Sequence, residues 1–188
     1  MKIVNMSENI RNALRNSGIS NKMRSLESCD WIVYEELDRK IVGAAGIGGS
    51  FHVSGIQISN DFQGKGLGKL LQGAVIDEAK RRNYSFVTVF NDPRNVPSEK
   101  LHNSFGYKTV FRVHYSTEIV NDVKILVFKS QGKIVERFLG VFNTRLGTFL
   151  LACLLKATKS LFPKIILYNE DTIPNPSIRC MVKNFEKI

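Results

Sequence analysis

The sequence predicts an α/β fold built on a mixed sheet, followed by a C-terminal helical extension. Three segments with strand character precede a glycine-rich segment, and a long amphipathic helix pattern follows it directly. Beyond that helix, strand and helix patterns alternate, which is typical of a mixed α/β sheet. With 188 residues, of which 43% are hydrophobic, the chain is large enough to bury a core of ordinary size.

The first part of the chain predicts one helix and three strands. Ser7 is a suitable N-cap for a short helix over residues 8–16. Residues 31–37 and 41–48 are rich in apolar residues and flank the polar turn 38–40, so they predict two antiparallel strands. A third strand is expected from Phe51 to Ile58.

The middle of the chain alternates between helix and strand patterns. Apolar residues recur at helical spacing over residues 67–82, which predicts an amphipathic helix. The β-branched and aromatic run that ends at residue 91 predicts a buried strand. A helix over residues 97–104 and a pair of strands over residues 107–120 and 123–130 complete this part.

The last third of the chain differs in character. Residues 131–167 have helical apolar spacing with few turn signals and predict one or two helices, whereas the tail from Asn169 is expected to be irregular. We therefore expect a domain over residues 1–130 and an extension over residues 131–188 packed on it. We expect the extension to cover the sheet or a binding cleft, to form a homodimer interface, or to rest on an anionic membrane surface.

Composition limits the partners and the compartment. The formal charge is +10, but the basic residues are spread along the chain without clustered aromatic platforms, so no nucleic-acid partner is expected. The three cysteines are odd in number and lack C-x-x-C spacing, so neither a disulfide framework nor a metal site is expected. Without an N-terminal apolar run of the signal-peptide type, we expect a soluble, cytoplasmic protein.

The glycine-rich segment predicts an anion-binding site. Gly64, Gly66 and Gly68 stand between a strand and the start of a helix, where backbone N–H groups have no partner within the helix. These groups lie at the positive end of the helix dipole and can bind a diphosphate. Lys65 and Lys69 add positive charge.

Two other phosphate-binding loops fit this segment poorly. A dinucleotide fingerprint needs a third glycine where this chain has Lys69. A Walker A loop needs Ser or Thr after its lysine, but Gly66 follows Lys65 and Leu70 follows Lys69.

Two motifs together resemble the GNAT family of acetyltransferases. Gln63-x-x-Gly66-x-Gly68 is similar to the family's pyrophosphate motif, Q/R-x-x-G-x-G/A. The segment from Asn95 to Tyr107 is similar to its N-x-x-A-x-x-L-Y-x-x-x-G-F segment. The resemblance covers roughly residues 8–129 and implies a GNAT-like acyl-CoA N-acyltransferase fold, with acetyl-CoA as co-substrate and an unidentified amine as acceptor.

The resemblance also implies which residues bind the cofactor. Backbone groups around Ile56 and Ile58 would hold the pantetheine arm, and Asn95 would lie on the cofactor's other side. The diphosphate would lie on Gln63, Gly64, Lys65, Gly66, Leu67, Gly68 and Lys69.

Candidate catalytic residues follow from the chemistry of transfer, which needs an acid for the departing thiolate and a base for the amine. Where the family usually has a tyrosine acid, this chain has His102, and a protonated imidazole can donate near neutral pH. Some members of the family carry a Glu on the strand before the pyrophosphate loop. At the corresponding place, six residues before Ile58, this chain has His52, which the resemblance therefore makes the candidate base. Further candidate bases lie on other predicted strands, as either-or pairs of neighbours: Glu35 or Glu36, and His114 or Tyr115.

The sequence therefore predicts an N-acetyltransferase that moves the acetyl group directly to an amine in a ternary complex. The alternative from another functional class is a non-catalytic acyl-CoA-binding or regulatory module with a decayed active site, which His102 in place of tyrosine keeps open.

Overall fold

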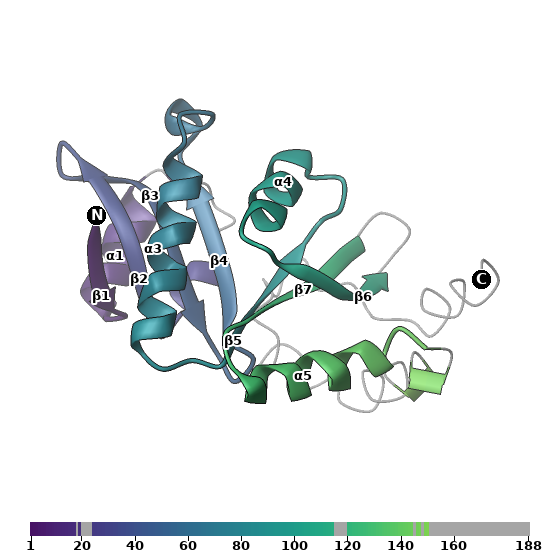
Figure 1. Cartoon of the computed structure of the whole chain (residues 1–188). Coiled ribbons are helices and arrows are strands. Elements are labelled where there is room, and N and C mark those ends of the chain that lie inside the picture. The colour runs from purple at the N-terminus through teal and green to yellow at the C-terminus, as the bar shows by residue number, and fades with distance from the viewer. Residues whose placement is uncertain (18, 20–23, 115–119, 145, 148, 151–188) are drawn as a thin grey trace. The chain divides into compact units, whose positions relative to one another are not determined.

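The computed structural model describes residues 1–17, 19, 24–114, 120–144, 146–147 and 149–150. The chain divides into two compact units, residues 1–87 and 88–188. Strands and helices alternate through both units (Figure 1), which confirms the predicted α/β class. Within the described residues, none of the helices combines the length and apolar character needed to cross a bilayer.

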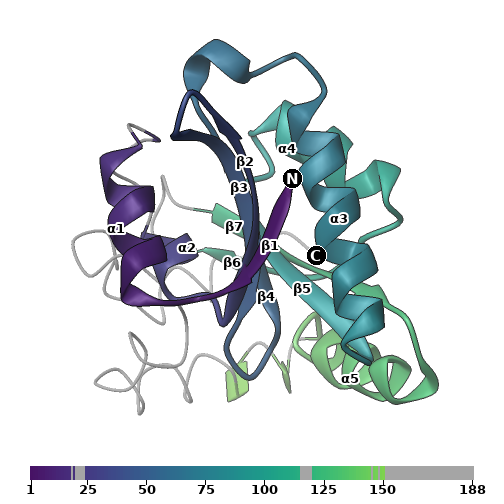
Figure 2. The same cartoon turned by 90° about the vertical axis from the view of Figure 1, so that its left-hand side faces the viewer.

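The first unit is an antiparallel sheet covered on both faces. Its strands are β1 (Lys2–Asn5), β2 (Trp31–Leu37), β3 (Lys40–Gly48) and β4 (Val53–Ile58), each paired antiparallel to the next. Figure 2 shows α1 (Glu8–Asn16) and α2 (Arg24–Glu27) on one face and α3 (Leu67–Arg81) on the other.

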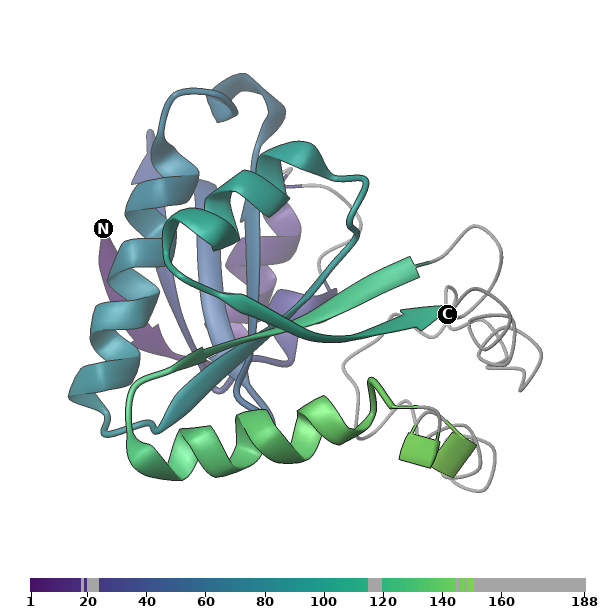
Figure 3. The same ribbon diagram turned by 45° about the vertical axis from the view of Figure 1, so that its right-hand side comes forward.

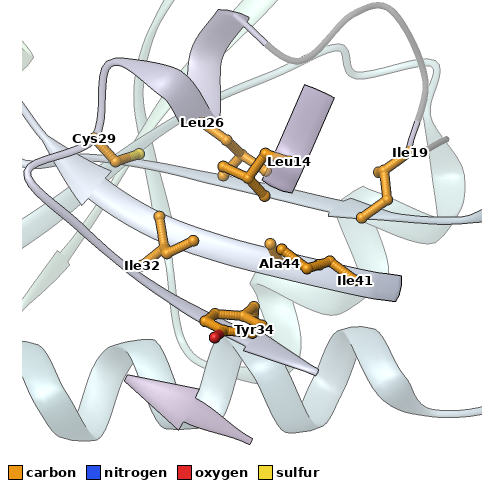
Figure 4. Close-up of a cluster of buried hydrophobic side chains, with 8 residues drawn as sticks. All are labelled: Leu14, Ile19, Leu26, Cys29, Ile32, Tyr34, Ile41 and Ala44. Atoms are coloured by element: carbon orange, nitrogen blue, oxygen red, sulfur yellow. The ribbon is translucent and has the colours of Figure 1, made fainter. Parts of the chain in front are cut away.

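The core beneath α1 explains why these segments form the elements they do. Leu14 of α1 and Leu26 of α2 are fully buried against Ile32 of β2 and Ala44 of β3 (Figure 4). Ser7 caps α1 as predicted, because its Oγ accepts a hydrogen bond from the backbone N–H of Ile10 at 3.4 Å. Burial of this apolar cluster removes its side chains from water and anchors both helices to the sheet.

The second unit contains most of β5 (Phe86–Asn91), then α4 (Val96–Ser104), β6 (Lys108–His114), β7 (Val120–Val127) and α5 (Ser130–Val141). Its strands follow the order β5-β7-β6, and β6 and β7 are antiparallel. Helix α5 packs against β6 and β7 (Figure 3). Its outer face exposes Ile134, Phe138 and Val141, whereas Leu139 points inward.

Several predicted elements differ in extent from the structure. Strand β1 and helix α2 were missed because each spans only four residues and has no complete apolar period. Strand β4 begins at Val53 rather than Phe51, since Gly49 to His52 form a turn closed by a 2.9 Å backbone hydrogen bond. Val120 begins β7 instead of ending the preceding strand.

The proposed C-terminal extension is described only in part. Helix α5 begins at Ser130, next to the predicted boundary after residue 130, and ends at Val141. Most of the predicted 131–167 helical region and the whole tail lie outside the described residues. The division at residue 130 and the three roles considered for the extension therefore stay predictions.

Candidate functional site

The glycine-rich segment forms the connection between β4 and α3, seen at the top of Figure 1. Strand β4 ends at Ile58, and a 3₁₀ turn over Asn60–Phe62 redirects the chain. The side-chain amide of Gln63 donates to the carbonyl of Ile58 at 3.2 Å and to Oδ1 of Asn60 at 3.1 Å. Gln63 therefore ties the strand end to the loop and fixes the position of the residues that follow it.

Two glycines in this loop have left-handed backbone angles. Gly64 has a φ of +74° and Gly66 a φ of +82°, a region that other residues adopt only with strain. A Cβ placed on either glycine would meet no atom within 4 Å in the described chain. The backbone is thus left open toward the space in front of it, which is what close approach of a diphosphate requires.

The start of α3 offers N–H groups to that space. Gly66 is the N-cap residue, and within the described residues no side chain caps the helix. Leu67 packs inward, because its Cδ2 atom lies 3.0 Å from where a Cβ on Gly43 of β3 would stand. Of the predicted cofactor residue Leu67, only the backbone therefore faces away from the sheet. The loop's positive charge comes from Lys65, whose Nζ lies 5.2 Å from the centre of the Phe62 ring, and from the exposed Lys69.

Ile56 and Ile58 lie on the face of β4 that α3 covers. Ile58 pairs with Gly43 of β3. A Cβ on that glycine would stand 3.5 Å from Cγ1 of Ile58 and 3.0 Å from the side chains of Leu67 and Leu71 of α3. Ile56 pairs with Ala45 two residues along. Both side chains are half-buried on this face. The role of their backbone groups in holding a cofactor arm, which the family resemblance implies, stays a prediction.

His52 lies at the opposite end of β4 from the glycine loop, because it immediately precedes the first residue of the strand. Its ring stacks on Tyr84 with centroids 4.3 Å apart and lies 5.2 Å from Phe86. Burial lowers the pKa of His52, against an opposing effect of Asp30, so the neutral ring is favoured. Within the described residues, its buried Nδ1 has no hydrogen-bond partner.

Of the other candidate bases, Glu35 and Glu36 each form an ion pair, Glu35 with the N-terminal amine at 2.8 Å. Glu36 forms a 2.9 Å ion pair with Lys2 of β1, and a bulge in the β2–β3 pairing separates Glu35 from Glu36. His114 is the last residue of β6, and Tyr115 lies outside the described residues.

In the second unit, Asn95 caps the start of α4, where its Oδ1 accepts from the backbone N–H of Ser98 at 3.2 Å. His102 lies one turn after Ser98 on α4, is 4% exposed, and meets the Tyr107 ring edge-on at 5.3 Å. Burial, followed by the charge of Lys124, lowers the pKa of His102 to about 4, although Glu99 opposes this. The imidazole is therefore neutral near pH 7, and its protonation, which donation to a thiolate requires, is disfavoured.

Sequence reasoning missed a polar network beside His102. Lys124 of β7 is 1% exposed, and its ammonium group contacts Glu99 of α4 and donates to Oδ1 of Asn103 at 2.9 Å. Asn91 at the end of β5 donates to Glu99 at 2.6 Å and accepts from Ser98 at 2.5 Å. The available signal was a lone lysine within the otherwise apolar run from Val123 to Val127.

Across the described residues, His, Cys, Asp and Glu side chains form no group of three or more that could hold a metal ion. The candidate site therefore consists of backbone N–H groups, lysines and glycines in the first unit. In the second unit, a neutral histidine lies beside an ion pair whose lysine is buried.

Comparison with known proteins identifies the family. A family model described as an acetyltransferase (GNAT) domain matches residues 7–135. Solved structures with a similar fold include an N-acetyltransferase from Staphylococcus aureus Mu50, 20% identical with a TM-score of 0.52, over 67% of this chain and 97% of that one.

Two further structures share this fold. A putative acetyltransferase from Acinetobacter baylyi ADP1 is 18% identical, with a TM-score of 0.54 over 68% of this chain and 92% of that one. A GNAT family acetyltransferase from Elizabethkingia anophelis, solved with acetyl-CoA bound, is 15% identical, with a TM-score of 0.52 over 68% and 97% of the two chains. At 15–20% identity, these similarities show a shared fold and nothing further.

Proposed function

Because this chain belongs to the GNAT acetyltransferase family, whose domain model matches residues 7–135, we propose that it transfers the acetyl group of acetyl-CoA directly to an amine acceptor. The observation that carries the proposal is the start of α3, which no side chain caps within the described residues and which two left-handed glycines precede. The acetyl-CoA bound to the Elizabethkingia anophelis enzyme supports the choice of co-substrate.

The residues of the loop fit a diphosphate. Space is open above Gly64 and Gly66, the first-turn N–H groups of α3 can donate, and Lys65 and Lys69 add charge. Gln63 holds the loop, and we assign the pantetheine arm to backbone groups of Ile56 and Ile58 and the cofactor's other side to Asn95. Acetyl-CoA supplies a thioester carbonyl that an amine can attack.

A first experiment tests this binding site by calorimetric titration with acetyl-CoA. The double variant Lys65→Ala/Lys69→Ala removes two charges from the loop and is expected to raise the Kd about tenfold or more, since charge-assisted hydrogen bonds contribute about 1.5–3 kcal/mol each. Arg39→Ala/Lys40→Ala, at two exposed positions in the hairpin between β2 and β3, is the control that removes the same number of charges. Equal affinities for the two variants would remove the loop from the site.

A second experiment tests transfer by measuring CoA release from acetyl-CoA with a panel of small amines and peptides. His102→Phe and His52→Ala test whether either histidine takes part in proton transfer, the sequence having assigned donation to His102 and acceptance to His52. A role in the reaction predicts a lower turnover and an altered pH profile, and an unchanged profile excludes that residue. Tight binding of acetyl-CoA without transfer to any acceptor would favour the non-catalytic binding module.

A further inference from the structure

The hydrogen-bond network of the second unit determines which atoms carry its hydrogens, starting from the ion pair between Lys124 and Glu99. Hydrogen-bond donors surround Glu99: Lys124 contacts its Oε1, Asn103 donates to the same oxygen at 3.3 Å, and Asn91 donates to its Oε2 at 2.6 Å. Burial raises the pKa of Glu99, but the hydrogen bonds and charge of Lys124 outweigh it and the net pKa is lowered. Glu99 is thus a carboxylate and can only accept hydrogen bonds.

The carboxylate fixes the orientation of the Asn91 side chain. Only the amide nitrogen of Asn91 can donate to Glu99, so that nitrogen must face the carboxylate. The carbonyl oxygen of Asn91 then faces Ser98, which lies 2.5 Å away. Since a carbonyl oxygen only accepts, the single hydroxyl hydrogen of Ser98 is committed to Asn91.

The committed hydroxyl determines what Ser98 can offer to His102. Its oxygen lies 3.4 Å from Nδ1 of His102, one turn along α4, and has only lone pairs left to present. A hydrogen on Nδ1 completes this contact, whereas the other neutral tautomer would place two lone pairs face to face.

We propose that Lys124, Glu99, Asn91 and Ser98 act as positioning residues that hold neutral His102 with its hydrogen on Nδ1, which leaves Nε2 as its acceptor nitrogen. The consequence for catalysis rests on the proposed function. A neutral imidazole with a lone pair on Nε2 takes a proton from the amine or from an intervening water, forming a bond from Nε2 to hydrogen as the N–H bond of the amine breaks. His102 is thereby assigned to proton acceptance, the reverse of the role taken over from the family's tyrosine.

The test is ¹⁵N NMR of the full chain labelled on histidine, without acetyl-CoA or acceptor, at neutral pH. The chain has three histidines, so His102→Gln identifies the resonances of His102. We expect Nδ1 of His102 to resonate as a protonated, pyrrole-type nitrogen and Nε2 as a pyridine-type nitrogen. The opposite pattern in the unmodified protein overturns the proposal without any variant.

Ser98→Ala tests the network itself. We expect the ratio of the two tautomers to fall about fivefold, the equivalent of about 1 kcal/mol for one net hydrogen bond. Ser98→Thr restores a hydroxyl and should restore the ratio. Ser104→Ala is the matched control, because its hydroxyl donates to the Leu101 carbonyl on the same helix. A ratio unchanged by Ser98→Ala contradicts the positioning role.

Turnover separates this inference from the proposed function. In the CoA-release assay, Ser98→Ala should lower the rate in proportion to the measured fall in the fraction of the Nδ1-protonated tautomer, by at most about fivefold. Ser98→Thr should recover the rate, and Ser104→Ala should leave it unchanged. If the unmodified protein transferred no acetyl group, the proposed function would be contradicted. The tautomer of His102 would be unaffected, because NMR measures it without substrates. A normal rate in Ser98→Ala despite a clearly reduced fraction of the Nδ1-protonated tautomer would overturn the assignment of His102 to proton acceptance.

Discussion

The ammonium group of Lys124 on β7 contacts the carboxylate of Glu99 on α4, and the two partners differ in how far solvent reaches them. The side chain of Lys124 is 2% exposed, whereas that of Glu99 is 28% exposed. A buried ion that loses its partner costs several kcal/mol, because the charge keeps its desolvation penalty. The cost of removing either partner should therefore depend on which one remains.

Glu99→Gln is expected to be more destabilising than Lys124→Met. The first change leaves a buried ammonium group with its hydrogen bond to Asn103 and should lower the free energy of unfolding by about 3 kcal/mol. The second leaves a carboxylate that water can reach and fills the lysine's place with an apolar chain, so the loss should be about 1 kcal/mol. Urea denaturation measures both.

The double variant Glu99→Gln/Lys124→Met serves as the control. It removes both charges and should be more stable than Glu99→Gln alone, because no unpaired ion stays buried. Equal losses for the two single variants, or additive losses in the double variant, would contradict this account.

Gly66→Ala tests the loop through its backbone. A Cβ at a φ of +82° should lower stability by about 1 kcal/mol. It should also raise the Kd for acetyl-CoA about tenfold, because strain that shifts one N–H away from the diphosphate loses a charge-assisted hydrogen bond of about 1.5 kcal/mol. Thermal unfolding and titration with acetyl-CoA measure the two effects.

The control for this change is Gly140→Ala near the end of α5, where a Cβ would also meet nothing within 4 Å among the described residues. Alanine favours a helix over glycine by up to about 1 kcal/mol, so this variant should keep or gain stability and bind acetyl-CoA normally. Matching losses of affinity in the two variants would show that the position of the added methyl group is unimportant.

Tyr84→Phe should destabilise the first unit, because it removes a hydrogen bond to Trp31, the chain's single tryptophan. Trp31 is fully buried, and its indole N–H donates to the Tyr84 hydroxyl at 3.1 Å. Phenylalanine keeps the ring against His52 but leaves the indole donor without this acceptor, at a cost of about 1–3 kcal/mol. Tryptophan fluorescence follows unfolding in urea. An unchanged midpoint would show that the bond contributes nothing to stability.

The parts of the molecule that sequence reasoning predicted well depend on local signals. The start of α3 follows from glycines at Gly64 and Gly66 and from apolar spacing after Leu67, all within a few residues. Helix α1 likewise follows from its own cap, Ser7. Propensity, capping and left-handed glycines act over one or two helical turns, so a single sequence contains enough information to find them.

The parts that it missed depend on long-range contacts. Lys124 and Glu99 lie 25 residues apart, and only the packing of β7 against α4 makes that lysine a buried partner. His102 was found by its place in a motif, but its neutral state follows from burial and from Lys124, neither of which the motif contains. Strand β1 similarly needs its partner β2 to become regular. Such features follow from the fold rather than from neighbouring residues.

His102 also predicts how stability depends on pH. An unfolded chain binds a proton at this histidine near pH 6.5, whereas the folded chain does so only near pH 4. The unfolded state therefore holds more protons between these values, and the free energy of unfolding falls as the pH falls from 6.5 to 4. Between pH 7 and pH 5 the loss should be about 2 kcal/mol.

His102→Gln should remove most of this loss of unfolding free energy. Urea midpoints at pH 7 and pH 5 measure it. His52 contributes with the same sign because burial also lowers its pKa, so His52→Gln should remove a further part. Hydrogen bonds from Arg81 foremost lower the pKa of Glu78 to about 2, so its stabilisation is lost only below about pH 4.5. Glu78→Gln should consequently leave the difference in stability between pH 7 and pH 5 unchanged. If His102→Gln also left that difference unchanged, His102 would not be held neutral by its surroundings.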